Sequence, residues 1–178
     1  MMKISFPSAL AACLFAAAVL SGCAETESGS EPSFYRNMAR QGVQVDTAAA
    51  ASMISGYRRN NGLEPVTVDP ALNRLAEQQA AAMARSDKLD HNAGGPFAAR
   101  MKAAGYSYKG AAENIGAGYY TLAEAFSGWR DSPPHRANML LKGATRVGIA
   151  AIYRPDTKYK VFWSMILAAP PDQRSAGG

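Results

Sequence analysis

Residues 146–167 of the chain, RVGIAAIYRPDTKYKVFWSMIL, decide the fold class. Apolar and β-branched residues dominate 146–153 and 159–167, and the turn-forming run Arg154-Pro155-Asp156-Thr157 separates the two segments. This pattern predicts two strands joined as a hairpin. The second strand is apolar on both faces, as expected for a strand in the interior of a sheet.

Helical signals come before this hairpin. Asp69-Pro70 places an N-cap residue before proline at the first helical position, and predicts a helix that runs to about Leu89. Thr47 predicts the cap of an earlier helix, which ends at Asn60-Asn61-Gly62. Three shorter helices are expected, at Phe97–Ala104, at Leu122–Trp129 and over one or two turns from Ser132-Pro133. Helices followed by strands predict an α+β fold, with helices packed on a small antiparallel sheet.

Length and composition limit the possible classes of protein. A chain of 178 residues suits one domain plus a targeting segment. The 16 glycines and 10 prolines follow no period, which excludes collagen and coiled coil, and 48% hydrophobic residues exclude wholesale disorder. The 19 Lys and Arg exceed the 14 Asp and Glu only mildly and form no basic run, so no nucleic-acid partner is expected.

The N-terminus carries a targeting signal. Residues 1–22, MMKISFPSALAACLFAAAVLSG, have the short basic start, apolar stretch and small final residues of a secretory signal peptide. Ser5, Pro7 and Ser8 leave an apolar run shorter than the ~20 residues of a membrane span. The following Leu20-Ser21-Gly22-Cys23 resembles the lipobox of bacterial lipoproteins. That resemblance implies cleavage before Cys23, a diacylglycerol on its thiol and an extracytoplasmic, membrane-anchored protein; a plain secretory signal is the alternative.

Four segments follow from these signals. After the signal peptide we expect a lipidated Cys23 with a flexible tether over 23–46, a single domain over 47–169 and a disordered tail over 170–178. Ala24, rather than Asp, after the acylated cysteine favours the outer membrane in a Gram-negative host. Cys13 leaves with the signal peptide and Cys23 is acylated, so no disulfide is expected.

The two histidines, His91 and His135, are the first candidates for a functional site. His91 follows a helix end, whereas His135 lies in the first turn after a Ser132 cap, where a helix N-terminus keeps an imidazole neutral. Glu113 lies between them, flanked by small residues. From the residues alone, an ordinary surface or core residue is the favoured interpretation for each of the three, and the 44-residue separation of the histidines matches no local metal motif.

Several motifs, in order along residues 47–167, resemble the CAP superfamily of cysteine-rich secretory proteins, antigen 5 and plant pathogenesis-related-1 proteins, in its disulfide-free bacterial branch. They are Leu89-Asp90-His91, Gly105-Tyr106, Glu113-Asn114-Ile115, Trp129-xx-Ser132-Pro133-x-His135-Arg136-x-Asn138 and Val147-Gly148-Ile149. The resemblance implies a three-layer α-β-α sandwich and a cleft with two histidines and two acids. Carried over by position, the cleft residues are His91, His135 and Glu113, with Ser132 in the place of the second acid.

The missing acid weakens any mechanism that needs two carboxylates. Asp131 is adjacent and Glu124 lies on the preceding helix, but neither matches the position. Two imidazoles and one carboxylate could still hold Zn²⁺, with water completing a tetrahedron.

Three functions are therefore compatible with the sequence. We rank first a surface-anchored binding module for a small apolar or lipidic ligand or a cell-envelope partner, since eukaryotic members of the family bind sterols and fatty acids. A structural envelope protein with a vestigial cleft comes second. A metal-dependent hydrolase that uses the two-histidine cleft comes third, because of the missing acid.

Overall fold

The structure is a computed structural model that describes residues 1 and 31–171. The signal peptide, Cys23 and most of the expected tail lie outside the described residues and stay predictions. The elements are η1 (Ser33–Tyr35), α1 (Thr47–Asn60), β1 (Thr67–Val68), α2 (Pro70–Ser86), α3 (Phe97–Ala103), β2 (Gly110–Ala117), α4 (Leu122–Asp131), α5 (Pro133–Met139), β3 (Arg146–Tyr153) and β4 (Val161–Ala169).

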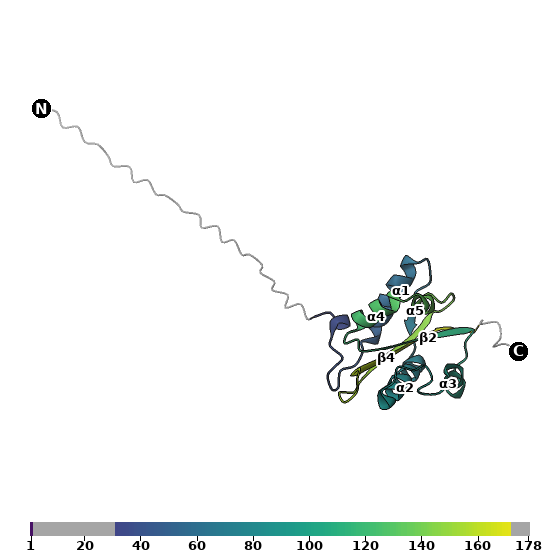
Figure 1. The fold of residues 1–178 in the computed structure, drawn as a ribbon. Helices are drawn as coiled ribbons and strands as arrows, with labels where there is room; N and C mark the ends of the chain where they lie inside the picture. Colours follow the sequence, from purple (N-terminus) through teal and green to yellow (C-terminus); the bar gives the residue numbers. More distant parts are fainter. Residues whose placement is uncertain (2–30, 172–178) are drawn as a thin grey trace.

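One four-stranded sheet separates two layers of helices (Figure 1). Its strand order is β1-β3-β4-β2, with β1 parallel to β3 and the other pairs antiparallel. Helices α2 and α3 lie on one face of the sheet, and α1, α4 and α5 lie on the other. The α+β class and the α-β-α sandwich are therefore confirmed.

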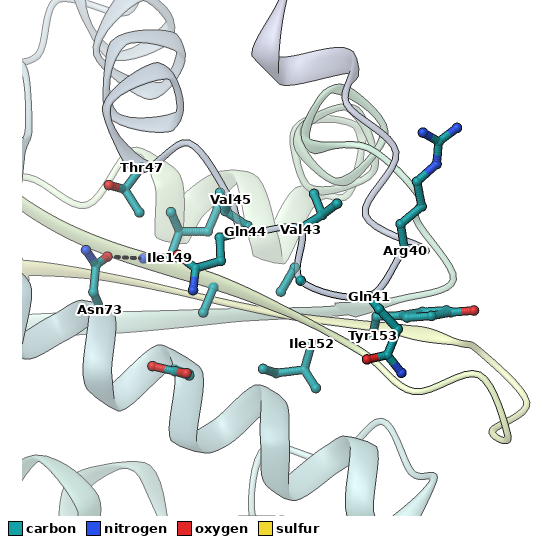
Figure 2. A pocket seen from close by; sticks show the side chains of 14 residues that line it. Arg40, Gln41, Val43, Gln44, Val45, Thr47, Asn73, Ile149, Ile152 and Tyr153 are labelled. Atoms are coloured by element: carbon teal, nitrogen blue, oxygen red, sulfur yellow. Dashed lines mark hydrogen bonds between the residues drawn. The ribbon is translucent and has the colours of Figure 1, made fainter.

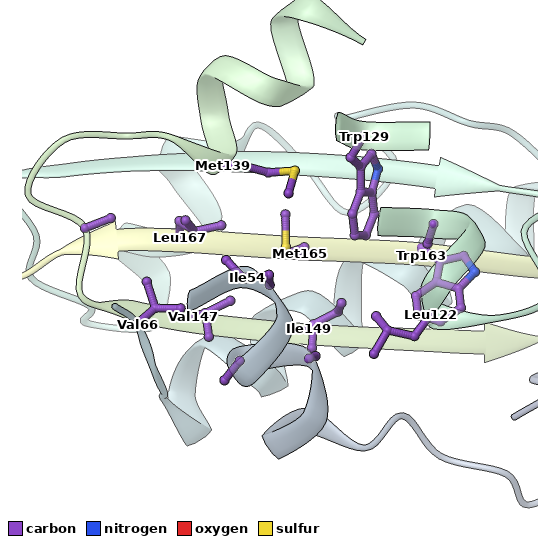
Figure 3. Packing of buried hydrophobic residues seen from close by; sticks show 14 of the residues in the cluster. Ile54, Val66, Leu122, Trp129, Met139, Val147, Ile149, Trp163, Met165 and Leu167 are labelled. Carbon is purple, nitrogen blue, oxygen red and sulfur yellow. The ribbon is translucent and has the colours of Figure 1, made fainter. Parts of the chain in front are cut away.

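Strand β4 is the centre of the core, since all nine of its residues are buried. Trp163, Met165 and Leu167 point towards α1, α4 and α5, as Figure 3 shows for the packing around Trp129. Alternate residues, such as Phe162 and Ile166, face the α2 layer instead. The prediction of an interior strand from its two apolar faces is thus confirmed.

The boundaries differ from the predictions in ways that have local causes. Asp46, not Thr47, caps α1 by accepting a hydrogen bond from the Ala49 N–H. Helix α2 ends at Ser86, three residues before Leu89, because Asp87 adopts the left-handed conformation with φ 49°.

Two strands lie in segments for which the sequence suggested no element. Strand β2 is rich in Gly and Ala and has no alternating pattern, and β1 has only two residues. Both are held in place by their neighbours in the sheet, β4 and β3.

The expected tether over 23–46 is too long, because its described part packs against the domain. Met38 is 4% exposed and its N–H donates to the carbonyl of Tyr120 at 2.7 Å. Val43 and Val45 pack on the same core cluster. The sequence from Phe34 mixes apolar and polar residues, and the apolar ones complete the layer of α1 and α4.

A buried cation, Arg58, ties α1 to the segment after α5. Its guanidinium donates to the carbonyls of Glu64, Met139, Leu141 and Ala144 at 2.7–3.0 Å, and burial lowers its pKa from the usual value. Four carbonyl acceptors compensate for the desolvation of this charge. The position of α5, which carries His135, is fixed in this way.

No helix among residues 31–171 is long and apolar enough to span a bilayer.

Candidate functional site

Glu113 is the buried residue around which the other residues of the site are arranged. It lies in the middle of β2, opposite Ile166 of β4, and its side chain is 2% exposed on the α2–α3 face of the sheet. The Arg100 Nη2 of α3 donates to its Oε2 at 2.6 Å, and the His91 Nδ1 lies 2.9 Å from its Oε1. Both carboxylate oxygens are therefore engaged within the protein.

His91 is oriented by this carboxylate and by the loop that carries it. The Gln79 side chain, fully buried on α2, donates to the carbonyls of Asp90 and His91 and accepts from the Gly94 N–H. Because the Glu113 carboxylate faces a guanidinium and accepts hydrogen bonds, the proton of neutral His91 resides on Nδ1. The Nε2 lone pair is then available on a side chain that is 51% exposed.

His135 approaches from the other helical layer. It lies in the first turn of α5, where its carbonyl accepts from Asn114 at 3.0 Å. Asn138 completes the network by donating to the Glu113 carbonyl at 3.1 Å and to the Asn114 side-chain oxygen at 2.9 Å. The segments that carry the two histidines thus meet at β2, an edge strand of the sheet, where the His91 side chain contacts Glu113 and the His135 backbone contacts Asn114.

The pKa of His135 lies below its ordinary value of 6.5, first because of burial and second because of the charge of the nearby His91. The sequence predicted a neutral His135 from its place at a helix N-terminus. The lowered pKa agrees with a neutral imidazole, but burial is its main cause. Ser132 occupies the N-cap position of α5, but its side chain makes no capping hydrogen bond, contrary to the expectation.

The two acids near Ser132 are used elsewhere. Asp131 is 66% exposed and pairs with Arg130 at 2.8 Å, and this guanidinium lowers the pKa of Asp131. Glu124 accepts from the backbone of Thr121 in a capping box at the start of α4. Neither replaces the second acid, so Glu113 is the carboxylate that contacts the histidine site.

The arrangement fits a three-ligand zinc site poorly. Glu113 already accepts from Arg100 and His91. Within residues 31–171, no three His, Cys, Asp or Glu side chains are grouped so that they could hold a metal ion. The donors that could contact an ion are the two imidazoles alone, with Glu113 as the outer partner of one.

Sequence reasoning missed Arg100 and Gln79. Both lie on helices with no motif around them, and only the packing of α2 and α3 brings them to Glu113 and His91. Asn114 and Asn138 stood in the quoted motifs, but their roles as connectors between β2 and α5 needed the structure.

Comparisons with known proteins agree with the fold and the motifs. The model of the cysteine-rich secretory protein (CAP) family matches residues 51–167. The uncharacterized protein YkwD of Bacillus subtilis (strain 168) is 32% identical over 120 residues, which are 60% of this chain and 46% of YkwD. The chain thus matches less than half the length of that relative.

Two solved structures share the fold. An extracellular protein containing an SCP domain from Bacillus anthracis str. Ames has a TM-score of 0.59 and 20% identity, over 68% of this chain and 39% of that one. An outer surface protein of Borrelia burgdorferi has a TM-score of 0.62 and 18% identity, over 72% of this chain and 98% of that one. At these identities the likeness concerns the fold alone.

The matched residues 51–167 include most of α1 and β4 and all the helices and strands between them, whereas η1 lies before them. They also include His91, Arg100, Glu113 and His135. The chain belongs to the CAP family, the family of cysteine-rich secretory proteins.

Proposed function

We propose that this protein is a lipid-anchored, extracytoplasmic binding module whose histidine site contacts a polar component of the cell envelope. The observation that carries the proposal is the chain Arg100–Glu113–His91, with contacts of 2.6 and 2.9 Å. It holds the half-exposed His91 imidazole in one orientation, so that little conformational entropy is lost when Nε2 accepts a hydrogen bond from a ligand.

The chemistry of the site favours a neutral hydrogen-bonding partner. The lowered pKa of His135 keeps its imidazole uncharged around neutral pH. Neutral imidazoles accept from hydroxyl and amide groups, which envelope glycans and their peptides supply in quantity. The cavity of about 400 Å³ along β3 lies away from the histidines, so it gives no support to an apolar ligand at the histidine site.

Binding is tested by cosedimentation of the protein with purified peptidoglycan. The proteins compared are the wild type, His91→Ala, His135→Ala and, as a matched control, Lys88→Ala, which changes an exposed residue beside the site. We expect both histidine variants to lose most of the pelleted fraction while Lys88→Ala keeps it. Equal pelleting of all four proteins would contradict the proposal.

The anchor is tested separately through Cys23. Cys23→Ser removes the thiol that accepts the diacylglycerol, so the protein should remain unprocessed or be released from the membrane. Metabolic labelling with a radioactive fatty acid measures the modification directly. A Cys23→Ser protein that is still labelled and extracted with membranes would rule the anchor out.

A metal-dependent hydrolase is a second candidate, and one observation favours it. A carboxylate on the Nδ1 side of a histidine is the usual outer partner of a zinc-bound imidazole, and Glu113 holds His91 in this way. His91 and His135 would hold the ion, which would supply Lewis acidity and a bound water of lowered pKa.

Calorimetric titration with zinc decides between the candidates. If the hydrolase hypothesis holds, His91→Ala and His135→Ala each abolish the heat of binding, and Ser132→Glu strengthens binding by adding the missing carboxylate. The affinity should also fall as the pH drops through ~6.5, because protons compete for the imidazoles. Negligible heats for wild type and for all variants would rule out the hydrolase.

A further inference from the structure

The outer edge of β3 lines an open slot between the two helical layers. The slot has a volume of about 400 Å³, and its floor is Ile149, Ala150, Ala151, Ile152 and Tyr153. Figure 2 shows Asn73 of α2 at the Ile149 end, with Val43 and Val45 along one wall. The slot is therefore bounded by α2 on one side and by the segment before α1 on the other.

The slot exists because β1 is short. It pairs in parallel with only Arg146 and Val147 of β3, and the chain then turns at Asp69 into α2. From Gly148 onwards, no strand in the described part of the chain pairs with the outer edge of β3.

Hydrogen-bonding groups of the backbone face this slot. The Ile149 N–H donates to the Asn73 side-chain oxygen at 2.9 Å, and the Val147 carbonyl accepts from the Asp69 N–H. Odd-numbered residues of β3 therefore direct their N–H and C=O groups away from β4. Beyond Asn73, four outward backbone groups of β3 have no strand partner among residues 31–171. They are the Ile149 carbonyl, the N–H and carbonyl of Ala151 and the Tyr153 N–H.

These groups select the chemistry of an occupant. An acyl chain would desolvate these backbone groups and leave them without hydrogen bonds, which is unfavourable. An extended peptide supplies N–H and C=O groups with the matching repeat of two residues. The rim carries one cation and one carboxylate, Arg40 and Glu77, which complement a peptide with charges of both signs.

We propose that the β3 edge binds an extended peptide segment of a partner protein as an additional strand of the sheet. The peptide pairs with Ile149, Ala151 and Tyr153, and its side chains alternate between the wall of Val43 and Val45 and the α2 side with Ile152. This site lies on the opposite edge of the sheet from the histidines and does not depend on their function.

The probes are two acetylated, fluorescein-labelled peptides, Lys-Val-Thr-Val-Thr-Val-Glu and the same peptide with its Lys and Glu exchanged. They cover both directions of pairing relative to Arg40 and Glu77. Each is titrated with the full chain, and fluorescence anisotropy measures binding. We expect saturable binding of at least one peptide; if neither saturates, the proposal is wrong.

Ala151→Pro removes an outward N–H without removing a bond to β4, and proline is tolerated at such edge positions. It should weaken binding about tenfold, as expected for the loss of one hydrogen bond and of close backbone approach. Ala151→Ser keeps the N–H and serves as the matched control. A folded Ala151→Pro protein that binds like the wild type would overturn the proposal.

Two N-methylated forms of the peptide that binds provide a measurement that needs no variant protein. One is methylated at the odd residues and the other at the even residues. Pairing with β3 engages the N–H groups of only one set, so one form should lose binding at least about tenfold while the other keeps it. Equal binding by both forms would exclude strand pairing.

Discussion

The two edges of the sheet differ in how their outward backbone groups are paired. At the β2 edge, the outward carbonyls of Glu113 and Ile115 accept from the side chains of Asn138 and Trp129 at 3.1 and 2.9 Å. At the β3 edge, one side chain, Asn73, pairs with one N–H, and the groups beyond it face a slot. Exposed edges pair readily with other strands, so a covered edge is closed to this mode of binding and an open edge invites it.

If both sites bind as proposed, this difference gives two kinds of recognition. The histidine site presents side chains that are held in one geometry by a buried ion pair and two asparagines. The slot presents backbone groups, which are indifferent to the sequence of the peptide that pairs with them. Changes at one edge should therefore leave the other edge largely unaffected, and the following predictions test that independence.

The largest effect is expected for Arg100→Met. The variant leaves the Glu113 carboxylate buried and without its guanidinium, which typically costs about 3–5 kcal/mol of unfolding free energy. Urea unfolding measures the loss. The double variant Arg100→Met with Glu113→Gln removes the unpaired charge and should recover much of the stability.

The same variants test the independence of the edges. Where Arg100→Met remains folded, peptide binding at the β3 slot should match that of the wild type. A single variant as stable as the double variant would show that the ion pair does not hold the β2 edge.

A smaller effect is expected for Met38→Ala. The side chain lies in the core cluster at 4% exposure, so truncation should cost about 2 kcal/mol, at the low end for buried Met→Ala changes because the segment can adjust. The segment continues into the wall of the slot, so peptide binding should weaken while zinc and peptidoglycan binding do not change. Thermal unfolding measures the loss of stability, and Ala39→Gly, beside it but without a large side chain, is the control.

An unchanged melting temperature for Met38→Ala would restore the expectation that residues up to 46 are a free tether. A deletion to Thr47 should then also unfold like the full chain. The structure predicts instead that this deletion loses more stability than Met38→Ala alone, because Val43 and Val45 are removed with it.

The smallest effect concerns the pH dependence of stability at His135. Its folded-state pKa lies below the ordinary 6.5, so the unfolded chain binds the proton more tightly than the folded chain does. The contribution of His135 is thus fully present above pH ~6.5 and is lost as the pH falls towards the folded-state pKa. Between about pH 7.5 and pH 5, the wild type should lose more unfolding free energy than His135→Gln.

Urea unfolding at both pH values makes the comparison. Equal losses for the two proteins would show that His135 is as accessible to protons in the folded chain as in the unfolded one. Peptide binding in the slot should keep the same pH dependence in both, since His135 lies at the other edge.

Much of the framework could be predicted because its signals are local. Asp69-Pro70 specifies the start of α2, and the turn after Tyr153 specifies the β3–β4 hairpin. Motif resemblance also brought His91, Glu113 and His135 together, as members of one family site. Each of these inferences uses residues that are close in sequence or that stand in a known order.

The sequence by itself thus determined the α+β class, the start of α2 and the central hairpin, and it offered His91, Glu113 and His135 as candidates for the site. Only the tertiary structure decided that β2 is a strand, since Gly110–Ala117 has little intrinsic strand pattern and is held by pairing with β4. It also decided the partners of Glu113 and the open edge of β3. Such features depend on contacts between residues far apart in the chain, which hydrophobic periodicity and capping signals do not encode.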